Sequence, residues 1–170
     1  MILYVLVVAA IVVCVAALIR PSARKILGLV AAVLVGVAVV IRVVADVDVP
    51  QEDLLGLFGL ALAVIGGSVV TTASFNQIDG HNEVKAETLE AAGKVLRGGT
   101  WIGMLERFVV FATLVAGYPA GIAYALAIKG LGRYPELHNQ KQPGAAERFI
   151  IGTMISVIWA GTCAYVAKGL

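Results

Sequence analysis

Apolar runs of membrane-spanning length constrain this chain more than any other feature of its sequence. Residues 1–19 are uninterrupted apolar residues, and about 20 residues in a helix are enough to cross the hydrocarbon layer of a bilayer. The chain of 170 residues is 60% hydrophobic and only 14% charged, which is far from the balance of a soluble domain. The sequence therefore predicts an all-α, polytopic transmembrane helical bundle that forms a single integral membrane domain, residues 1–170.

Five segments are long and apolar enough to be membrane helices, and one further segment has a different character. The five predicted membrane segments are residues 1–19, 26–45, 54–75, 104–128 and 149–167. In residues 82–97, acidic and basic side chains alternate while apolar side chains fall on one side. This segment is predicted as an amphipathic helix that lies along the cytoplasmic membrane surface or against the bundle.

The basic residues after the first apolar run set the expected orientation. Arg20, Arg24 and Lys25 place the first loop in the cytoplasm and the amino terminus outside, by the positive-inside rule. No basic residue precedes the run, which argues against a cleaved signal peptide. With five crossings, the carboxyl terminus is expected inside, in a multi-pass protein of the inner (cytoplasmic) membrane.

The fourth segment contains a break that leaves two alternatives. Gly-Tyr-Pro at 117–119 interrupts residues 104–128 near their middle. A single kinked helix would carry Lys129 and three later basic residues to the outside, where basic residues are scarce. Two half-helices that turn back would return Lys129 to the cytoplasm, but this arrangement needs a buried, non-helical turn. The straight helix is favoured because proline kinks are common in membrane helices.

Small residues recur every four positions in two of the predicted helices and indicate close packing. The two rows are Gly59, Ala63, Gly67 and Thr71 in the third segment, and Gly152, Ser156, Ala160 and Ala164 in the fifth. Such rows let neighbouring backbones approach, so the two faces are expected to meet. The predicted helix-packing positions are Gly59, Gly67, Gly117, Gly152 and Ser156.

Glu106 and Arg107, in the fourth segment, are the strongest pointer to function, because charges in a membrane segment are costly unless they are paired. Adjacent helical residues point about 100° apart, so each is expected to find a partner on another segment. For Glu106 the expected partners are Arg97 or the first-loop arginines, and Lys129 only if the segment turns back. The candidate ligand or ion path comprises Glu106, Arg107, Lys129, Arg133, Glu147 and Arg148.

Residue types that carry catalysis or bind metals are scarce. Cys14 and Cys163 lie in apolar runs without a second cysteine or a histidine nearby, so neither a disulfide nor a metal site is predicted. The acidic residues between 46 and 53 match no calcium-binding pattern, and the chain has no phosphate-binding glycine loop. No catalytic residue, metal or cofactor is therefore predicted. The net charge of +2 is too small to indicate a nucleic-acid partner.

Four short patterns follow one another along the second half of the chain. They are IGMLER at 102–107, AIK at 127–129, RYPE at 133–136 and AERFIIGT at 146–153. Together they resemble the membrane half of a group of uncharacterised bacterial multi-pass proteins. The resemblance covers roughly the last 70 residues and not the first 100. It implies a bacterial inner-membrane protein and assigns no site residue.

Three functions are compatible with these features. The favoured one is a helix-packing protein that self-associates or serves as an accessory subunit, with membrane lipids and either further copies or another membrane subunit as its partners. The second is a small channel or transporter, in which Glu106, Arg107 and Lys129 line a hydrated route. This second function requires the polar residues that begin at Ser68 to face the same cavity, and the 117–119 break to form a site near the middle of the membrane.

The third function is an enzyme that acts on a lipid headgroup. Glu106 or Glu147 would be its base, and Arg107, Arg133 or Arg148 would hold phosphate. His81 and His138 fall in loops, where a lone histidine is usually an exposed residue. The sequence has no acidic pair that would hold magnesium on a pyrophosphate, and this places the enzyme last.

Overall fold

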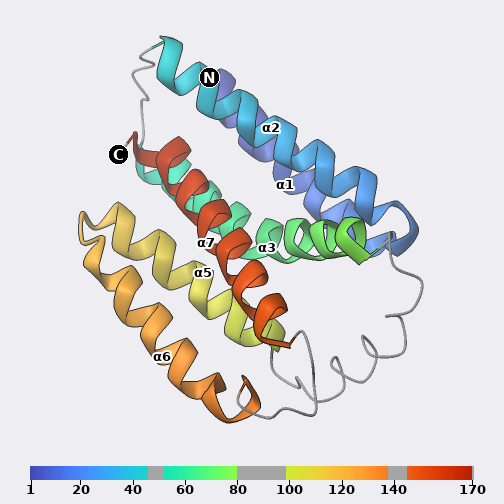
Figure 1. The fold of residues 1–170 in the computed structure, drawn as a ribbon. Coiled ribbons are helices and arrows are strands. Elements are labelled where there is room, and N and C mark those ends of the chain that lie inside the picture. Colours follow the sequence, from blue (N-terminus) through green and yellow to red (C-terminus); the bar gives the residue numbers. More distant parts are fainter. Residues whose placement is uncertain (46–51, 80–98, 138–144, 170) are drawn as a thin grey trace.

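The computed structural model describes residues 1–45, 52–79, 99–137 and 145–169, and these residues form six α-helices and no strand (Figure 1). The helices are α1 (Ile2–Ile19), α2 (Arg24–Ala45), α3 (Glu52–Asp79), α5 (Gly99–Val115), α6 (Ala120–Leu137) and α7 (Ala145–Lys168), and a short 3-10 helix, η1 (Pro21–Ala23), joins α1 to α2. The predicted all-α helical bundle is confirmed. The predicted amphipathic helix, residues 82–97, lies outside the described residues.

Four helical stretches of the described chain are long and apolar enough to cross a membrane. They are Ile2–Ile19, Pro21–Ala45, Asp53–Gln77 and Ala146–Lys168. Each contains one of the predicted membrane segments or coincides with it. The fifth predicted segment, residues 104–128, is divided between α5 and α6.

α1 and α2 form an antiparallel hairpin that packs small side chains inward. At the turn, the backbone N–H of Arg20 donates to the Ala16 carbonyl at 2.9 Å, and Arg24 Nε donates to the Ala17 carbonyl at 3.3 Å. The buried residues of the hairpin are Leu3, Val7, Ala10, Cys14, Ala17, Gly28, Ala31, Val35 and Ala38. The outward faces carry exposed valine, leucine and isoleucine, a surface that lipid tails would cover.

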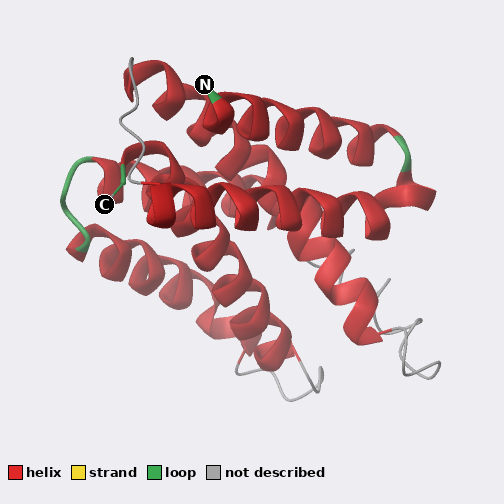
Figure 2. Ribbon diagram, turned by 90° about the horizontal axis from the view of Figure 1, so that it is seen from above, coloured by secondary structure: helices red, strands yellow, loops and turns green. Residues whose placement is uncertain are grey.

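α3 and α7 lie side by side at the centre of the bundle and pack against each other (Figures 1 and 2). A Cβ atom at Gly59 would be 2.9 Å from the Cβ atom of Ala167, so the two backbones need glycine to approach this closely. Trp159 Nε1 donates to the Leu62 carbonyl at 3.1 Å, which satisfies the buried indole. The predicted contact between these two helices is confirmed.

The predicted straight helix through residues 104–128 is wrong, because α5 ends at Val115 and the chain turns back. Gly117 has a φ of 70°, its N–H donates to the Leu114 carbonyl at 2.9 Å, and the Tyr118 N–H donates to the Thr113 carbonyl at 2.8 Å. These two bonds and the left-handed glycine form a Schellman motif, which ends a helix. The predicted packing position Gly117 has no neighbour within 4 Å of an added Cβ atom.

Both chain ends lie at the same end of the bundle, together with the 117–119 turn (Figures 1 and 2). Lys168 Nζ donates to the Val115 carbonyl at 2.9 Å, and Gly169 lies against Arg42 near the end of α2. We call this the terminal end, and we call the opposite end, which contains η1, the η1 end. The expected placement of the termini on opposite sides of a membrane does not fit this arrangement, because the α5–α6 hairpin adds one helix.

Candidate functional site

The charged residues of α5 lie inside the bundle, where α3, α5, α6 and α7 adjoin. Glu106 is 6% exposed and Arg107 is 4% exposed, and the buried polar residues Thr153 and Ser156 come from α7. Glu106 is about 10 Å along α5 from its first residue, so this site lies nearer the η1 end than the terminal end. We call Glu106, Arg107 and Lys129 the charge cluster.

The hairpin brings Lys129 of α6 to Glu106 of α5, although the two residues are 23 positions apart. Lys129 Nζ forms an ion pair and hydrogen bond with Glu106 Oε2, and it also donates to Thr153 Oγ1 at 2.8 Å. The ring centroid of Phe149 lies 5.3 Å from the same nitrogen. The ammonium group of Lys129 is thereby held by α5 and α7 at once.

The conditional prediction that Lys129 joins Glu106 if the segment turns back is confirmed. The expected pairing of Glu106 with the first-loop arginines is wrong, since its partner in the described part of the chain is Lys129. Arg97 lies outside that part.

Arg107 binds two other helices through three hydrogen bonds. Its Nε donates to the Val64 carbonyl at 3.1 Å, its Nη2 donates to Ser68 Oγ at 2.8 Å, and its Nη1 donates to Ser156 Oγ at 3.3 Å. Glu106 and Arg107 therefore find separate partners on other helices, as predicted. Ser156, predicted only as a packing residue, also acts as a hydrogen-bond acceptor.

Two glycines give the guanidinium group its space. A Cβ atom at Gly67 would be 2.5 Å from Arg107 Nε, and one at Gly103 would be 3.2 Å from Arg107 Nη1. Gly67 is thus a close-packing position, but its neighbour is an arginine of α5 rather than the backbone of α7. Gly152 packs against Phe75 of α3, at 3.2 Å from an added Cβ atom.

The charge cluster is unbalanced among the described residues. It contains two cations and one carboxylate, and the three hydrogen bonds of Arg107 all go to neutral oxygens. Glu106 Oε1 is buried and has no hydrogen-bond partner in the described chain. Buried charges are costly unless opposite charges and hydrogen bonds compensate them, so one positive charge and one acceptor oxygen remain incompletely compensated here.

The other three predicted path residues lie outside the cluster, nearer the η1 end. Arg148 lies with its guanidinium carbon 5.4 Å from the ring centroid of Phe75, and Glu147 is exposed. Arg133 follows Lys129 by one helical turn on α6. The structure therefore brings together three of the six predicted residues.

Thr153 and Val64 were not predicted as part of the site. Thr153 lies in an apolar segment next to Gly152, where a hydroxyl group is typical of helix packing. The only sequence signal for Thr153 was its place in the AERFIIGT pattern. A backbone carbonyl such as that of Val64 has no sequence signal at all.

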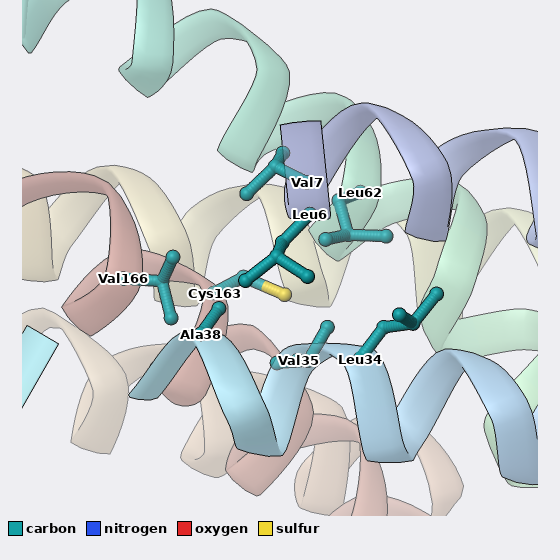
Figure 3. Close-up of a pocket in the computed structure, with 8 residues that line it drawn as sticks. All are labelled: Leu6, Val7, Leu34, Val35, Ala38, Leu62, Cys163 and Val166. Atoms are coloured by element: carbon teal, nitrogen blue, oxygen red, sulfur yellow. The ribbon is translucent and has the colours of Figure 1, made fainter. Parts of the chain in front are cut away.

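Towards the terminal end, the described interior is apolar. Its buried residues there are Leu55, Leu62, Val110, Phe111, Ala164 and Ala167. A small pocket on the other side of α3 and α7, shown in Figure 3, is lined by Leu6, Val7, Leu34, Val35, Ala38, Leu62, Cys163 and Val166. These side chains offer no charged group or strong hydrogen-bonding group that would orient a ligand, so the charge cluster is the stronger candidate site.

The fold and the charge cluster together define a helical membrane protein with charged side chains held between its helices. Comparisons with known proteins found no match, whether among family models, curated proteins or solved structures. The function of this protein must therefore be inferred from the geometry of the cluster.

Proposed function

We propose that this protein is a helix-packing membrane protein of the self-associating or accessory-subunit kind, in which the charge cluster holds the α5–α6 hairpin on the α3–α7 pair. The observation that carries the proposal is that each charged side chain binds another helix. Lys129 joins α6 to α5 and α7, and Arg107 joins α5 to α3 and α7.

Directional bonds suit this role because lipid tails are as apolar as leucine side chains. In a membrane, burial of apolar surface contributes little to helix association, so close packing and interhelical hydrogen bonds decide which helices pair. A guanidinium with three fixed acceptors is satisfied in one register of α5 against α3 and α7. The cluster would thereby select a single arrangement of the four helices.

The apolar interior between the cluster and the terminal end supports a packing role over an open pore. Phe111 and Leu62 are buried in that interior, at 4% and 2% exposure. A conducting path would need polar groups or water along its whole length. The Arg107–Ser68 contact agrees with the channel hypothesis, whereas the 117–119 turn lies at the terminal end of the bundle, away from the charge cluster.

The proposed setting is the inner (cytoplasmic) membrane of a bacterium, as the resemblance of the last 70 or so residues implies. The partners are membrane lipids and either further copies of this chain or another membrane subunit. Mass measurement of the protein released from lipid nanodiscs tests for self-association. A strictly monomeric mass would leave the accessory-subunit form of the proposal.

The holding role of the cluster is tested by thermal unfolding of the purified protein in detergent. Glu106→Gln and Lys129→Gln should each lower the Tm clearly, because the first leaves the partly buried Lys129 and the second leaves the buried Glu106 without its partner. The double variant with Glu106→Lys and Lys129→Glu should recover part of the loss. Glu147→Gln, a change at an exposed residue, is the matched control. Unchanged Tm values for both single variants would contradict the proposal.

A small channel or transporter is the second candidate, and a specific observation favours it. Among the described residues, the incompletely compensated positive charge and the lack of a hydrogen-bond partner for Glu106 Oε1 are more than helix packing requires. Ion flux into liposomes that contain the purified protein tests this candidate. Flux that Glu106→Gln abolishes without lowering the Tm would favour transport over packing.

A further inference from the structure

The basic residues are distributed unequally between the two ends of the bundle. In the described chain, Arg20, Arg24 and Lys25 adjoin η1, Arg133 lies in the last two turns of α6 and Arg148 in the first turn of α7, and α6 ends and α7 begins at the η1 end (Figure 1). At the terminal end it has Arg42 and Lys168. The remaining loop bases, Lys85, Lys94, Arg97 and Lys141, belong to sequence segments that join α3 to α5 and α6 to α7. The helices that flank those two segments end and begin at the η1 end (Figure 1).

Nine of the 13 lysines and arginines thus belong to the η1 end or to the segments that connect helices there. The terminal end instead has the acidic start of α3, where Glu52 and Asp53 follow Asp46 and Asp48 in the sequence. A straight helix through residues 104–128 would have put Lys129, Arg133, Lys141 and Arg148 beyond the opposite face. The hairpin removes that conflict with the positive-inside rule.

α5 and α6 have the dimensions of membrane-crossing helices. With 17 and 18 residues, they are about 26 and 27 Å long, close to the hydrocarbon thickness of about 30 Å. The charges that reduce their hydropathy, Glu106, Arg107 and Lys129, point into the bundle and bind one another or other helices. Their exposed side chains include large apolar or aromatic ones: Trp101, Leu105 and Phe108 on α5, and Tyr124, Ile128 and Leu131 on α6.

We infer that the chain crosses the bilayer six times, with the η1 end against the anionic cytoplasmic leaflet and with both termini and the 117–119 turn on the opposite side. The partner of the η1 end is a negatively charged lipid surface, which attracts lysine and arginine near the membrane. Exposed Trp101 and Tyr134 lie near this end, and exposed Tyr118 lies at the other, as expected of aromatic residues at the two interfaces. This inference does not depend on the role proposed for the charge cluster.

Labelling of single cysteines tests the inference. Cys14 and Cys163 are buried and are replaced by alanine. Ser22→Cys reports on the η1 end and Tyr118→Cys reports on the hairpin turn, and both positions are exposed. A membrane-impermeant maleimide is added to right-side-out and to inverted membrane vesicles. We expect Tyr118→Cys to react only in right-side-out vesicles and Ser22→Cys only in inverted vesicles.

Each other outcome overturns the inference in a distinct way. Reaction of both cysteines from the same side would mean that α5 and α6 do not cross the bilayer. The reverse pattern would place the basic end outside. A cysteine at position 118 that reacts only after detergent is added would place the turn within the bilayer, as in a re-entrant hairpin. Thermal unfolding of both variants, compared with the cysteine-free parent, checks that the fold is kept.

Discussion

Arg107 occupies the space that a side chain at Gly67 would need: a Cβ atom at Gly67 would lie 2.5 Å from Arg107 Nε. This close approach lets the guanidinium group reach the Val64 carbonyl, Ser68 and Ser156 at the same time. A glycine on α3 and an arginine on α5 therefore form one structural unit. Arg107 can be buried here only because Gly67 has no side chain.

Gly67→Ala should accordingly destabilise the protein by about 3 kcal/mol or more, because the displaced Arg107 would lose hydrogen bonds while it remains buried. Gly56→Ala, in the same helix, is the matched control, since an added Cβ atom there meets nothing within 4 Å. Because alanine has a higher helix propensity than glycine, the control change should be neutral or slightly stabilising. Thermal unfolding in detergent measures both variants, and equal Tm values for the two would contradict the packing of Arg107 on Gly67.

Lys129 offers two contacts of different strength that can be separated by mutation. Lys129→Met removes the partner of buried Glu106 and should cost about 3–5 kcal/mol. Thr153→Val keeps the ion pair and removes only the 2.8 Å hydrogen bond, so it should cost about 1 kcal/mol. Chemical or thermal unfolding in the same detergent measures both. If Thr153→Val costs as much as Lys129→Met, the ion pair is not the stronger of the two contacts.

The sequence predicts those helices that a local run of apolar residues marks. Residues 1–19, 26–45, 54–75 and 149–167 correspond to α1, α2, α3 and α7, because an apolar run of spanning length is visible without any knowledge of neighbours. The contact between α3 and α7 was also predictable, since small residues at four-residue spacing mark the face on which backbones approach.

The α5–α6 hairpin could not be predicted as firmly from the sequence, because Gly-Tyr-Pro is compatible with both a kinked helix and a helix end. Only the turned structure has the backbone hydrogen bonds at residues 113–118 and the contact of Lys129 with Glu106, 23 residues away. Neither is a property of the local pattern. The distribution of basic residues favours the turn, whereas the frequency of proline kinks in membrane helices favours the straight helix.

Gly117→Ala tests the turn itself. An L-amino acid with a side chain in the left-handed region costs about 1–2 kcal/mol, and Gly117 has a φ of 70°. The variant should therefore lower the Tm, although an added Cβ atom would meet no neighbour within 4 Å. Gly130→Ala within α6 has equally open surroundings and regular helical backbone, so it is the matched control and should be neutral or stabilising. The Schellman turn is contradicted if both changes have the same effect.

The two tryptophans provide a last comparison, between a buried and an exposed indole. Trp159 is 6% exposed, and its Nε1 donates to the Leu62 carbonyl at 3.1 Å across the α3–α7 interface. Trp159→Phe removes the indole hydrogen bond to that carbonyl and creates a small void beside Gly66, where the indole ring lies 2.7 Å from the position of an added Cβ atom. A loss of about 2 kcal/mol or more is expected. Trp101 is 73% exposed, so Trp101→Phe should leave the Tm in detergent nearly unchanged.

The fluorescence of each single-tryptophan variant provides a second measurement. The emission of Trp159 should resist quenching by a water-soluble quencher, and that of Trp101 should respond to the composition of the surrounding micelle. Equal stability losses for the two changes would contradict the central position of Trp159 between α3 and α7.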